Sequence, residues 1–233
     1  MGSSVWVAAP YPCGSRSAPN QRRLGAGSIT RMDADDRIRR ARSLRSVADA
    51  AAVYDHWAPD YDADVFGRLG FTGSERIADL LVAHMDDTGA AVLDLGCGTG
   101  AVGARLAKGA IGRIDGVDLS PAMLALARTT RAYGMLVAAD LTRPLPFRDG
   151  AYAASVSAGT FTSGHVGPGA VAECTRVVRP GGLVAWVIGT AVIDEFEPAL
   201  ARAALRIRHR SVEVIRRDGP PEGVMIVATC VGA

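Results

Sequence analysis

The sequence predicts an α/β domain in which helices cover a mostly parallel β-sheet. Short apolar segments alternate with helical segments over residues 91–207, and strands that alternate with helices pair in parallel. A glycine-rich loop, residues 96–100, follows the first apolar segment. Two further apolar segments flank the turn over residues 218–221, and we expect them to close the sheet as an antiparallel hairpin.

The predicted elements follow from hydrophobic periodicity and from residues that begin or end helices. We expect seven strands, over residues 91–95, 113–117, 135–139, 151–157, 182–188, 212–216 and 224–230. We expect the helices of the domain over residues 73–85, 101–108, 121–131, 169–178 and 195–207. Ser120 is a common N-cap residue and Pro121 suits the first helical position, so one of these helices has a defined start.

The residues before the sheet divide into two parts. The first 30 residues are rich in Gly, Ser, Pro and Arg and lack apolar periodicity, which indicates a mobile arm. Apolar residues at helical spacing then predict a helix over about 34–54, and Pro59 should break or kink the chain near Ala58. We therefore expect a mobile arm at 1–30, an N-terminal helical cap at 31–72 and a ligand-binding domain at 73–233.

The composition disfavours several classes of protein. Hydrophobic residues make up 48% of the 233 residues, which favours a globular fold over disorder. No apolar run approaches the roughly 18 residues of a membrane span, and the patch over residues 5–9 is too short for a signal peptide, so we expect a cytoplasmic protein. The four cysteines lack metal-ligand spacing, and the net charge of +2 gives no general attraction to nucleic acid.

The glycine loop is expected to bind a ligand, because ligands of open α/β sheets lie beyond the carboxyl ends of the strands. Gly96, Gly98 and Gly100 allow tight turns and close approach to the backbone. With Ala101 they also satisfy the loose dinucleotide pattern GxGxxA, which makes an NAD-dependent oxidoreductase one hypothesis. Asp94 argues against it, since a carboxylate inside the preceding strand would repel a pyrophosphate and favour a cationic ligand.

Two further carboxylates stand at the ends of the next two strands. Asp118 can accept hydrogen bonds from both hydroxyls of a ribose, and Asp140 or its neighbouring backbone can reach the exocyclic amine of adenine. Each acid taken alone could be a solvated strand end or a helix cap. Acids at three successive strand ends, one of them before a glycine loop, favour a single ligand site.

These motifs resemble those of the class I S-adenosylmethionine-dependent methyltransferases, which have a Rossmann-like fold. Residues 92–100 (VLDLGCGTG) match the first motif of that family at every position, and residues 116–120 and 138–141 resemble its second and third motifs. The resemblance implies S-adenosylmethionine as the cofactor. It places Asp94 and the glycine loop near the methionine part, Asp118 at the ribose and Asp140 near the adenine.

Two further segments narrow the resemblance to a smaller group within this family. Residues 54–62 (YDHWAPDYD) and 159–168 are similar to the Williams-Beuren-region methyltransferase-like proteins and to related small-molecule methyltransferases of bacteria. In that group the N-terminal tyrosines help to cover the cofactor site. The resemblance implies cofactor contacts from Tyr54, Tyr61, Asp94, Gly96, Cys97, Gly98, Gly100, Asp118, Leu119, Ser120, Met123, Asp140, Leu141, Ser157 and Ala158.

The acceptor of the methyl group is expected beside the loop after the fourth strand. His165 is the best candidate for a general base by residue type, although it could instead brace its loop, and His56 is a second candidate. Trp57, Thr160 and Phe161 are candidates for the acceptor pocket or for core packing. No Asn-Pro-Pro-Tyr segment of the amino-base DNA methyltransferases follows the fourth strand, which favours a small-molecule acceptor over nucleic acid.

Three hypotheses for the function therefore stand on the sequence. The first is a small-molecule methyltransferase that works by in-line methyl displacement, the second is the NAD-dependent oxidoreductase, and the third is a non-catalytic cofactor-binding protein with the same fold. The helical cap could roof the pocket of its own subunit or be exchanged between subunits. Both a monomer and a homo-oligomer formed through the N-terminal helices are open.

Overall fold

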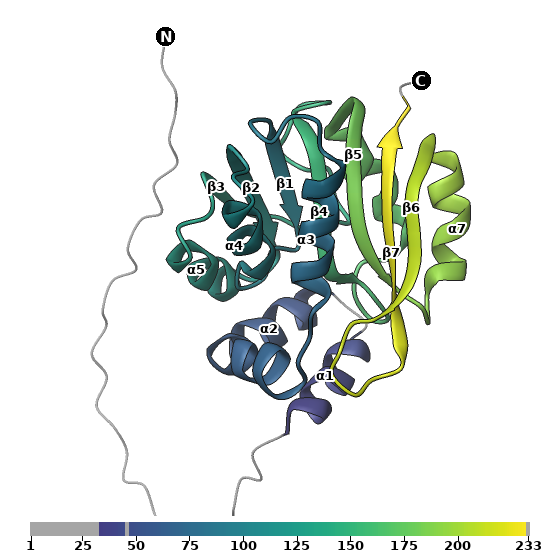
Figure 1. The fold of residues 1–233 in the computed structure, drawn as a ribbon. Coiled ribbons are helices and arrows are strands. Elements are labelled where there is room, and N and C mark those ends of the chain that lie inside the picture. The colour runs from purple at the N-terminus through teal and green to yellow at the C-terminus, as the bar shows by residue number, and fades with distance from the viewer. Residues whose placement is uncertain (1–32, 45–46, 232–233) are drawn as a thin grey trace, which may run out of the picture. The chain divides into compact units, whose positions relative to one another are not determined.

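The computed structural model describes residues 33–44 and 47–231, which contain one seven-stranded sheet (Figure 1). Its strands are β1 (Ala91–Leu95), β2 (Arg113–Asp118), β3 (Met135–Ala138), β4 (Tyr152–Phe161), β5 (Val178–Gly189), β6 (Leu205–Val214) and β7 (Pro221–Cys230). Their order across the sheet is β3-β2-β1-β4-β5-β7-β6, and β7 runs antiparallel to both of its neighbours. The predicted fold class is confirmed, while the predicted arm at 1–30 lies outside the described residues.

Seven α-helices and two short helices of other types are described in the same part of the chain. The α-helices are α1 (Ala34–Arg42), α2 (Val47–Asp62), α3 (Gly73–His84), α4 (Ala101–Lys108), α5 (Pro121–Thr129), α6 (Val171–Arg176) and α7 (Ile193–Arg202). A π-helix, η1 (Ala63–Arg68), continues from α2, and a 3₁₀-helix, η2 (Pro168–Ala170), leads into α6. No helix within the described ranges is both long enough and apolar enough to cross a membrane.

Alternate residues of each strand point to opposite sides, and helices cover both faces of the central strands. Val92 of β1 packs in an apolar cluster with α3 and α4 on one face. Its neighbours Leu93 and Leu95 belong to a second cluster, which α6 and α7 cover. Figure 1 shows α3 and α4 in front of the strands. Burial on both faces explains why the central strands read as continuous apolar runs in the sequence.

The strand order places a ligand site beside β1. The chain leaves β1 through α4 toward β2, and it leaves β4 through α6 toward β5, so the two connections cover opposite faces of the sheet. Strands β1 and β4 are neighbours in parallel register. The loops that follow them therefore diverge at the carboxyl edge of the sheet, which is the position where open α/β sheets bind ligands.

The predicted helix over 34–54 is wrong as one element. Helix α1 ends at Arg42, where the Ser43 hydroxyl donates to the Arg40 carbonyl oxygen at 2.9 Å and its amide donates to the same oxygen. Such local bonds compete with helix continuation. Of the expected break or kink near Ala58, the break is wrong, since α2 continues through Pro59 to Asp62. Pro59 removes one backbone donor, and the packed aromatic residues around it keep the helix intact.

The predicted helix over 195–207 is too long. Helix α7 ends at Arg202, and the backbone then turns through Ala204, whose φ is 49°. From Leu205 the chain pairs with β7 in antiparallel register, so tertiary pairing overrides the helical pattern of the sequence. The hairpin strands are longer than the predicted 212–216 and 224–230 for the same reason. Strand β4 likewise extends to Phe161, and the region predicted as helix over 169–178 divides into η2 and α6.

A buried carboxylate holds the N-terminal helices together. Asp64 of η1 is fully buried and accepts hydrogen bonds from the indole of Trp57 at 2.9 Å and from Arg37 of α1 at 2.5 Å. Arg68 also pairs with this carboxylate. A buried charge with several donors is stable only while its partners stay in place. Asp64 therefore joins α1, α2 and η1 into one unit.

Candidate functional site

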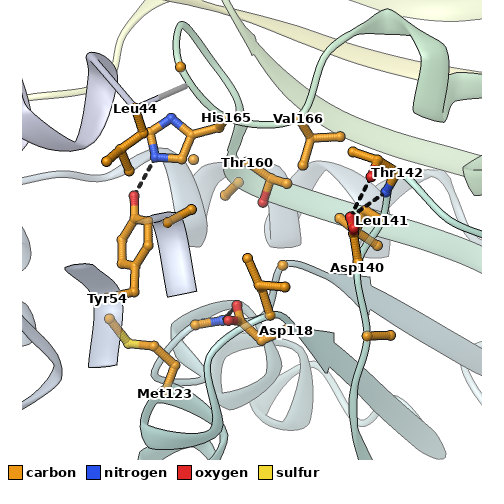
Figure 2. A pocket seen from close by; sticks show the side chains of 18 of the residues that line it. Leu44, Tyr54, Asp118, Met123, Asp140, Leu141, Thr142, Thr160, His165 and Val166 are labelled. Carbon is orange, nitrogen blue, oxygen red and sulfur yellow. Dashed lines mark hydrogen bonds between the residues drawn. The ribbon is translucent and has the colours of Figure 1, made fainter. Parts of the chain in front are cut away.

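A pocket of about 280 Å³, here called the first pocket, lies at the carboxyl edge of the sheet (Figure 2). Its walls come from the loops that follow β1, β2, β3 and β4 and from one side of α2. They include Leu44, Ala50, Tyr54, Tyr61, Gly96, Gly98, Asp118, Leu119, Met123, Ala139, Asp140, Leu141, Thr142, Ala158, Gly159, Thr160, Gly164, His165 and Val166. The pocket is therefore where the sequence predicts the ligand.

The glycine loop forms the floor of this pocket in left-handed backbone conformations. Gly96 and Gly98 have φ values of 68° and 52°, which residues with a side chain rarely adopt. A Cβ on Gly96 would collide with the Thr160 hydroxyl, whereas a Cβ on Gly98 would meet no atom within 4 Å. The loop is thus packed against β4 at Gly96 and exposes its backbone to the pocket at Gly98.

Asp118 presents its carboxylate to the pocket in a fixed orientation. One of its oxygens accepts the Gly98 amide at 2.8 Å, and the other accepts the Ser120 amide at 2.9 Å. Burial raises the pKa of Asp118, and these backbone donors counteract the shift. Because a carboxylate has about four lone-pair sites, both oxygens can still accept from the hydroxyls of a ligand. This arrangement suits a ribose.

Asp94 lies beneath the glycine loop and does not line the pocket. It is fully buried, and one carboxylate oxygen accepts the Tyr133 hydroxyl at 2.7 Å. Its other oxygen, Oδ1, has no hydrogen-bond partner among the described residues. Burial, with a contribution from Asp118, raises the pKa of Asp94 to about 7. A buried carboxylate of this kind is costly in isolation and would be stabilised by a ligand that brings a cationic group close to it.

Asp140 stands at the opposite side of the pocket from Tyr54 (Figure 2). Its Oδ1 accepts both the backbone amide and the hydroxyl of Thr142, at 2.8 and 2.7 Å. These two bonds fix the turn after β3. Asp140 and Leu141 thus line the pocket beyond Asp118, at the place expected for an adenine.

Helix α2 is fastened over the site by two aspartates that the sequence analysis did not single out. Asp55 accepts from the Ser120 hydroxyl and, at 3.2 Å, from the Ala122 amide, so it caps the start of α5. Asp62 accepts from the Thr99 hydroxyl of the glycine loop at 2.6 Å. Each of these aspartates follows a tyrosine, and the two Tyr-Asp pairs are seven residues apart in the sequence. This repeat is the sequence signal that could have identified them.

A second cavity of about 220 Å³ adjoins the first pocket and shares Tyr54, Tyr61, Ala158, Gly159 and His165 with it. The remaining walls come from the N-terminal helices, from the segment after β4 and from the ends of β5 and β7. They include Ile38, Ala41, Trp57, Val65, Phe66, Leu69, Phe71, Ser74, Thr162, Ser163, Val187, Gly189, Thr190, Ala191, Ile215, Arg216 and Glu222. Two chambers with a common wall can hold two different molecules.

A tyrosine and a histidine are hydrogen-bonded in that common wall. The Tyr54 hydroxyl and His165 Nε2 form a hydrogen bond, drawn in Figure 2. His165 Nδ1 lies 3.0 Å from the Ser163 carbonyl oxygen and 2.9 Å from the Thr162 hydroxyl. A carbonyl oxygen can only accept, so Nδ1 carries the ring proton and Nε2 accepts from Tyr54. The pair can therefore take up a proton at the junction of the two cavities.

The structure brings most of the predicted site residues into the two cavities. The first pocket contains ten of the fifteen predicted cofactor contacts, and Thr160 and His165 line it as well. Trp57 lines the second cavity. His56, the second candidate for a base, is exposed on α2 and lines neither cavity.

The other predicted residues lie behind the pocket walls. Ser157 donates to the Leu95 carbonyl oxygen at 2.8 Å, and Ser120 caps α5 by accepting the Met123 amide. Cys97 is buried, which raises the pKa of its thiol. Gly100 is the N-cap of α4. Phe161 is fully buried and packs against Trp186 and Phe196 in the core.

Comparison with known proteins places this site in a family. Residues 92–182 match the family described as methyltransferase domain. The human methyltransferase-like protein 27 is 36% identical over 151 residues, which are 64% of this chain and 61% of that protein. The malonyl-[acyl-carrier protein] O-methyltransferase of Geobacter sulfurreducens is 38% identical over 152 residues, which are 64% of this chain and 55% of that protein. The chain thus spans less than two thirds of these relatives.

The fold agrees with a solved structure. A TehB-like SAM-dependent methyltransferase from Corynebacterium glutamicum superimposes with a TM-score of 0.59 at 23% identity, over 77% of this chain and 98% of that one. The methyltransferase-domain match over residues 92–182 and the named relatives support a class I S-adenosylmethionine-dependent methyltransferase, a class whose cofactor is S-adenosylmethionine. The family and the cofactor predicted from the motifs are confirmed. Among the described residues, no cluster of His, Cys, Asp or Glu suits a metal ion.

Proposed function

We propose that this protein transfers a methyl group from S-adenosylmethionine in the first pocket to a small-molecule acceptor in the adjoining cavity. The observation that carries the proposal is the pair of cavities with one common wall, in which Tyr54 and His165 are hydrogen-bonded. The relatives named above are methyltransferases by name, which supports the same reaction class. The predicted cytoplasmic location and the predicted oligomeric states remain predictions.

The residues of the first pocket fit the cofactor. Asp118 is oriented to accept the ribose hydroxyls, Asp140 and Leu141 lie where the adenine is expected, and Gly98 leaves room for close approach. Asp94 contributes negative potential beneath the loop for the cationic amino group. When bound, S-adenosylmethionine supplies a methyl group on a sulfonium, which a nucleophile can attack in line with the carbon–sulfur bond.

The protein's part in such a reaction is to position the acceptor, exclude water and remove a proton. Proximity and orientation alone can supply a large share of the rate. His165 is proposed as the general base, with Tyr54 between it and the acceptor. Its ring orientation is set by Ser163 and Thr162, so Nε2 is held toward the junction.

A small molecule fits the acceptor role better than a nucleic acid. The second cavity holds about 220 Å³ and is lined mainly by apolar and aromatic side chains, which is typical of small-ligand sites. A nucleic-acid site would instead need a basic surface that follows the phosphate backbone. The net charge of the chain is only +2.

A thermal-shift comparison tests the proposal. S-adenosylhomocysteine should raise the melting temperature of the full chain with a dependence on ligand concentration, while NAD should not. The Asp118→Ala variant serves as the matched test of the site, because it should lose this stabilisation by S-adenosylhomocysteine. Stabilisation by NAD alone would favour the oxidoreductase. Firm cofactor binding with no methyl transfer to a broad panel of acceptors would favour a non-catalytic binding protein.

A further inference from the structure

We propose that the second cavity binds a neutral, hydroxylated aromatic acceptor of one or two rings, an inference that rests on the proposed methyltransferase function. Three features of the cavity support this chemistry: its aromatic lining, its internally paired charges and its volume. A fourth feature, the Tyr54–His165 pair in the common wall, determines where the hydroxyl lies.

The lining of the second cavity is aromatic on the side of the N-terminal helices. Tyr54 and Trp57 stack with ring centroids 6.0 Å apart, and Trp57 meets Tyr61 edge to face at 4.8 Å. Phe66 and Phe71 continue this surface, with Phe66 in contact with Tyr61. Aromatic walls favour flat, apolar ligands through stacked and edge-to-face contacts.

The charged side chains among the lining residues of the second cavity neutralise each other. Arg216 and Glu222 form an ion pair, and Asp35 lies 3.8 Å from the same guanidinium. Arg216 and Glu222 are mostly buried, with 21% and 14% of their side chains exposed. A carboxylated acceptor would have to compete with Glu222 for Arg216 and would lose hydration on entry. The cavity therefore discriminates in favour of uncharged molecules.

The volume of the cavity sets the size of the ligand. An engineered apolar cavity of about 150 Å³ in another protein holds benzene, and the second cavity measures about 220 Å³. A substituted single ring or two fused rings match this space.

The Tyr54–His165 pair indicates that the reacting group of the acceptor is a hydroxyl. A hydroxyl directed at Tyr54 can pass its proton to the Tyr54 oxygen, while the proton of Tyr54 passes to His165 Nε2. The acceptor oxygen then bonds to the methyl carbon, the electron pair of the broken carbon–sulfur bond stays on the sulfur, and His165 is left as an imidazolium. The Ser163 carbonyl accepts from Nδ1 and stabilises this charge.

Binding to the S-adenosylhomocysteine-loaded full chain tests the inference by calorimetry. The probes are a set of neutral phenols from phenol to 2-naphthol, together with 6-hydroxy-2-naphthoate as the carboxylated counterpart of the largest. We expect 2-naphthol to bind about tenfold more tightly than the carboxylate. Ile38→Trp adds bulk to the second cavity from α1 and should weaken 2-naphthol binding by about tenfold or more. Arg40→Trp, at an exposed position of the same helix, is the matched control and should bind like the wild type.

The outcomes separate this inference from the proposed function. A failure of S-adenosylhomocysteine to bind would contradict the function itself. With that ligand bound, the inference is overturned if the phenols do not bind, if the carboxylate binds more tightly, or if Ile38→Trp binds 2-naphthol unchanged. Phe66→Ala is a second variant, which enlarges the cavity at a residue that does not itself line the first pocket. It should shift the preference toward larger neutral phenols, and an unchanged preference would contradict the assignment.

Discussion

At the scale of single residues, the carboxylates after successive strands have different tasks. Asp118 is held by two backbone amides and faces the first pocket, whereas Asp94 is buried with one oxygen unpaired. The sequence indicates both positions, because the motif places them at strand ends. It could not indicate that Tyr133 would fill the space beside Asp94, since the contact joins residues 39 positions apart.

Asp94→Asn should stabilise the fold at high pH. The folded protein raises the pKa of Asp94 from 3.8 to about 7, so between these values it holds a proton that the unfolded chain releases. Stability contributed by this group is therefore lost as the pH rises from about 4 to 7. Urea denaturation at about pH 8 should show the Asn variant more stable by about 1–4 kcal/mol. The difference should be near zero at about pH 4, and equal stability at both pH values would contradict the burial argument.

The same substitution should weaken cofactor binding. An ionised Asp94 favours the cationic amino group of S-adenosylhomocysteine, so the affinity of the wild type should rise with pH through about 7. In Asp94→Asn the affinity should be lower by about tenfold and lose this pH dependence. Calorimetry at several pH values measures both effects. A wild-type affinity that is flat across this range would exclude a role for Asp94 in binding.

His165→Gln should slow methyl transfer far more than it changes cofactor affinity. Loss of a general base typically costs about 10²–10⁴ in rate. Tyr54→Phe removes the hydroxyl that connects His165 to the acceptor and should produce a related loss in kcat. A wild-type rate in both variants would indicate that His165 only holds the loop after β4 in place.

At the scale of elements, helix α2 is the roof of the site, and its attachment rests on polar contacts. Asp55 joins it to α5, and Asp62 joins it to the glycine loop. Its apolar periodicity predicted a helix but could not show that Pro59 is tolerated. That tolerance depends on Trp57 and Tyr61, which pack against each other across the proline turn.

Asp62→Ala should weaken the attachment of helix α2 to the glycine loop. The substitution removes the hydrogen bond from Thr99, which is the contact of α2 with the glycine loop, and leaves the contacts of Asp55 with α5 and of Tyr54 with His165 in place. S-adenosylhomocysteine affinity should fall by about tenfold, as expected for loss of a hydrogen bond to a charged group. His56→Ala, at an exposed position of the same helix, is the control and should leave affinity unchanged. Equal affinities in both variants would show that α2 does not depend on this contact.

Asp64→Asn should destabilise the N-terminal helices. The substitution leaves Arg37 and Arg68 without their buried carboxylate, and breaking such a pair typically costs about 3–5 kcal/mol. Limited proteolysis should cleave within α1 and α2 more readily in the variant, while the sheet remains protected. Unchanged protease resistance would mean that apolar packing of Trp57 and Val65 suffices.

At the scale of the whole molecule, the sequence predicted the central strands well, and the limits of the N-terminal helices and of the closing hairpin poorly. The strands are fixed by short-range alternation and by glycine turns, as at Gly96 and Gly98, so their positions can be read locally. Helix α1 ends where Ser43 donates to the Arg40 carbonyl oxygen, whereas the end of α7 depends on a partner distant in sequence, because Leu205 pairs with β7. The second cavity forms where the N-terminal helices meet the sheet, so no single sequence motif could predict it.

The central claim is that a cofactor in the first pocket and an acceptor in the second cavity meet at Tyr54 and His165. A crystal structure of the full chain with S-adenosylhomocysteine and 2-naphthol tests this most directly. We predict the ribose hydroxyls on Asp118, the sulfur facing the common wall and the naphthol oxygen within hydrogen-bond distance of Tyr54. Cofactor density away from Asp118, or naphthol bound outside the second cavity, would contradict the account.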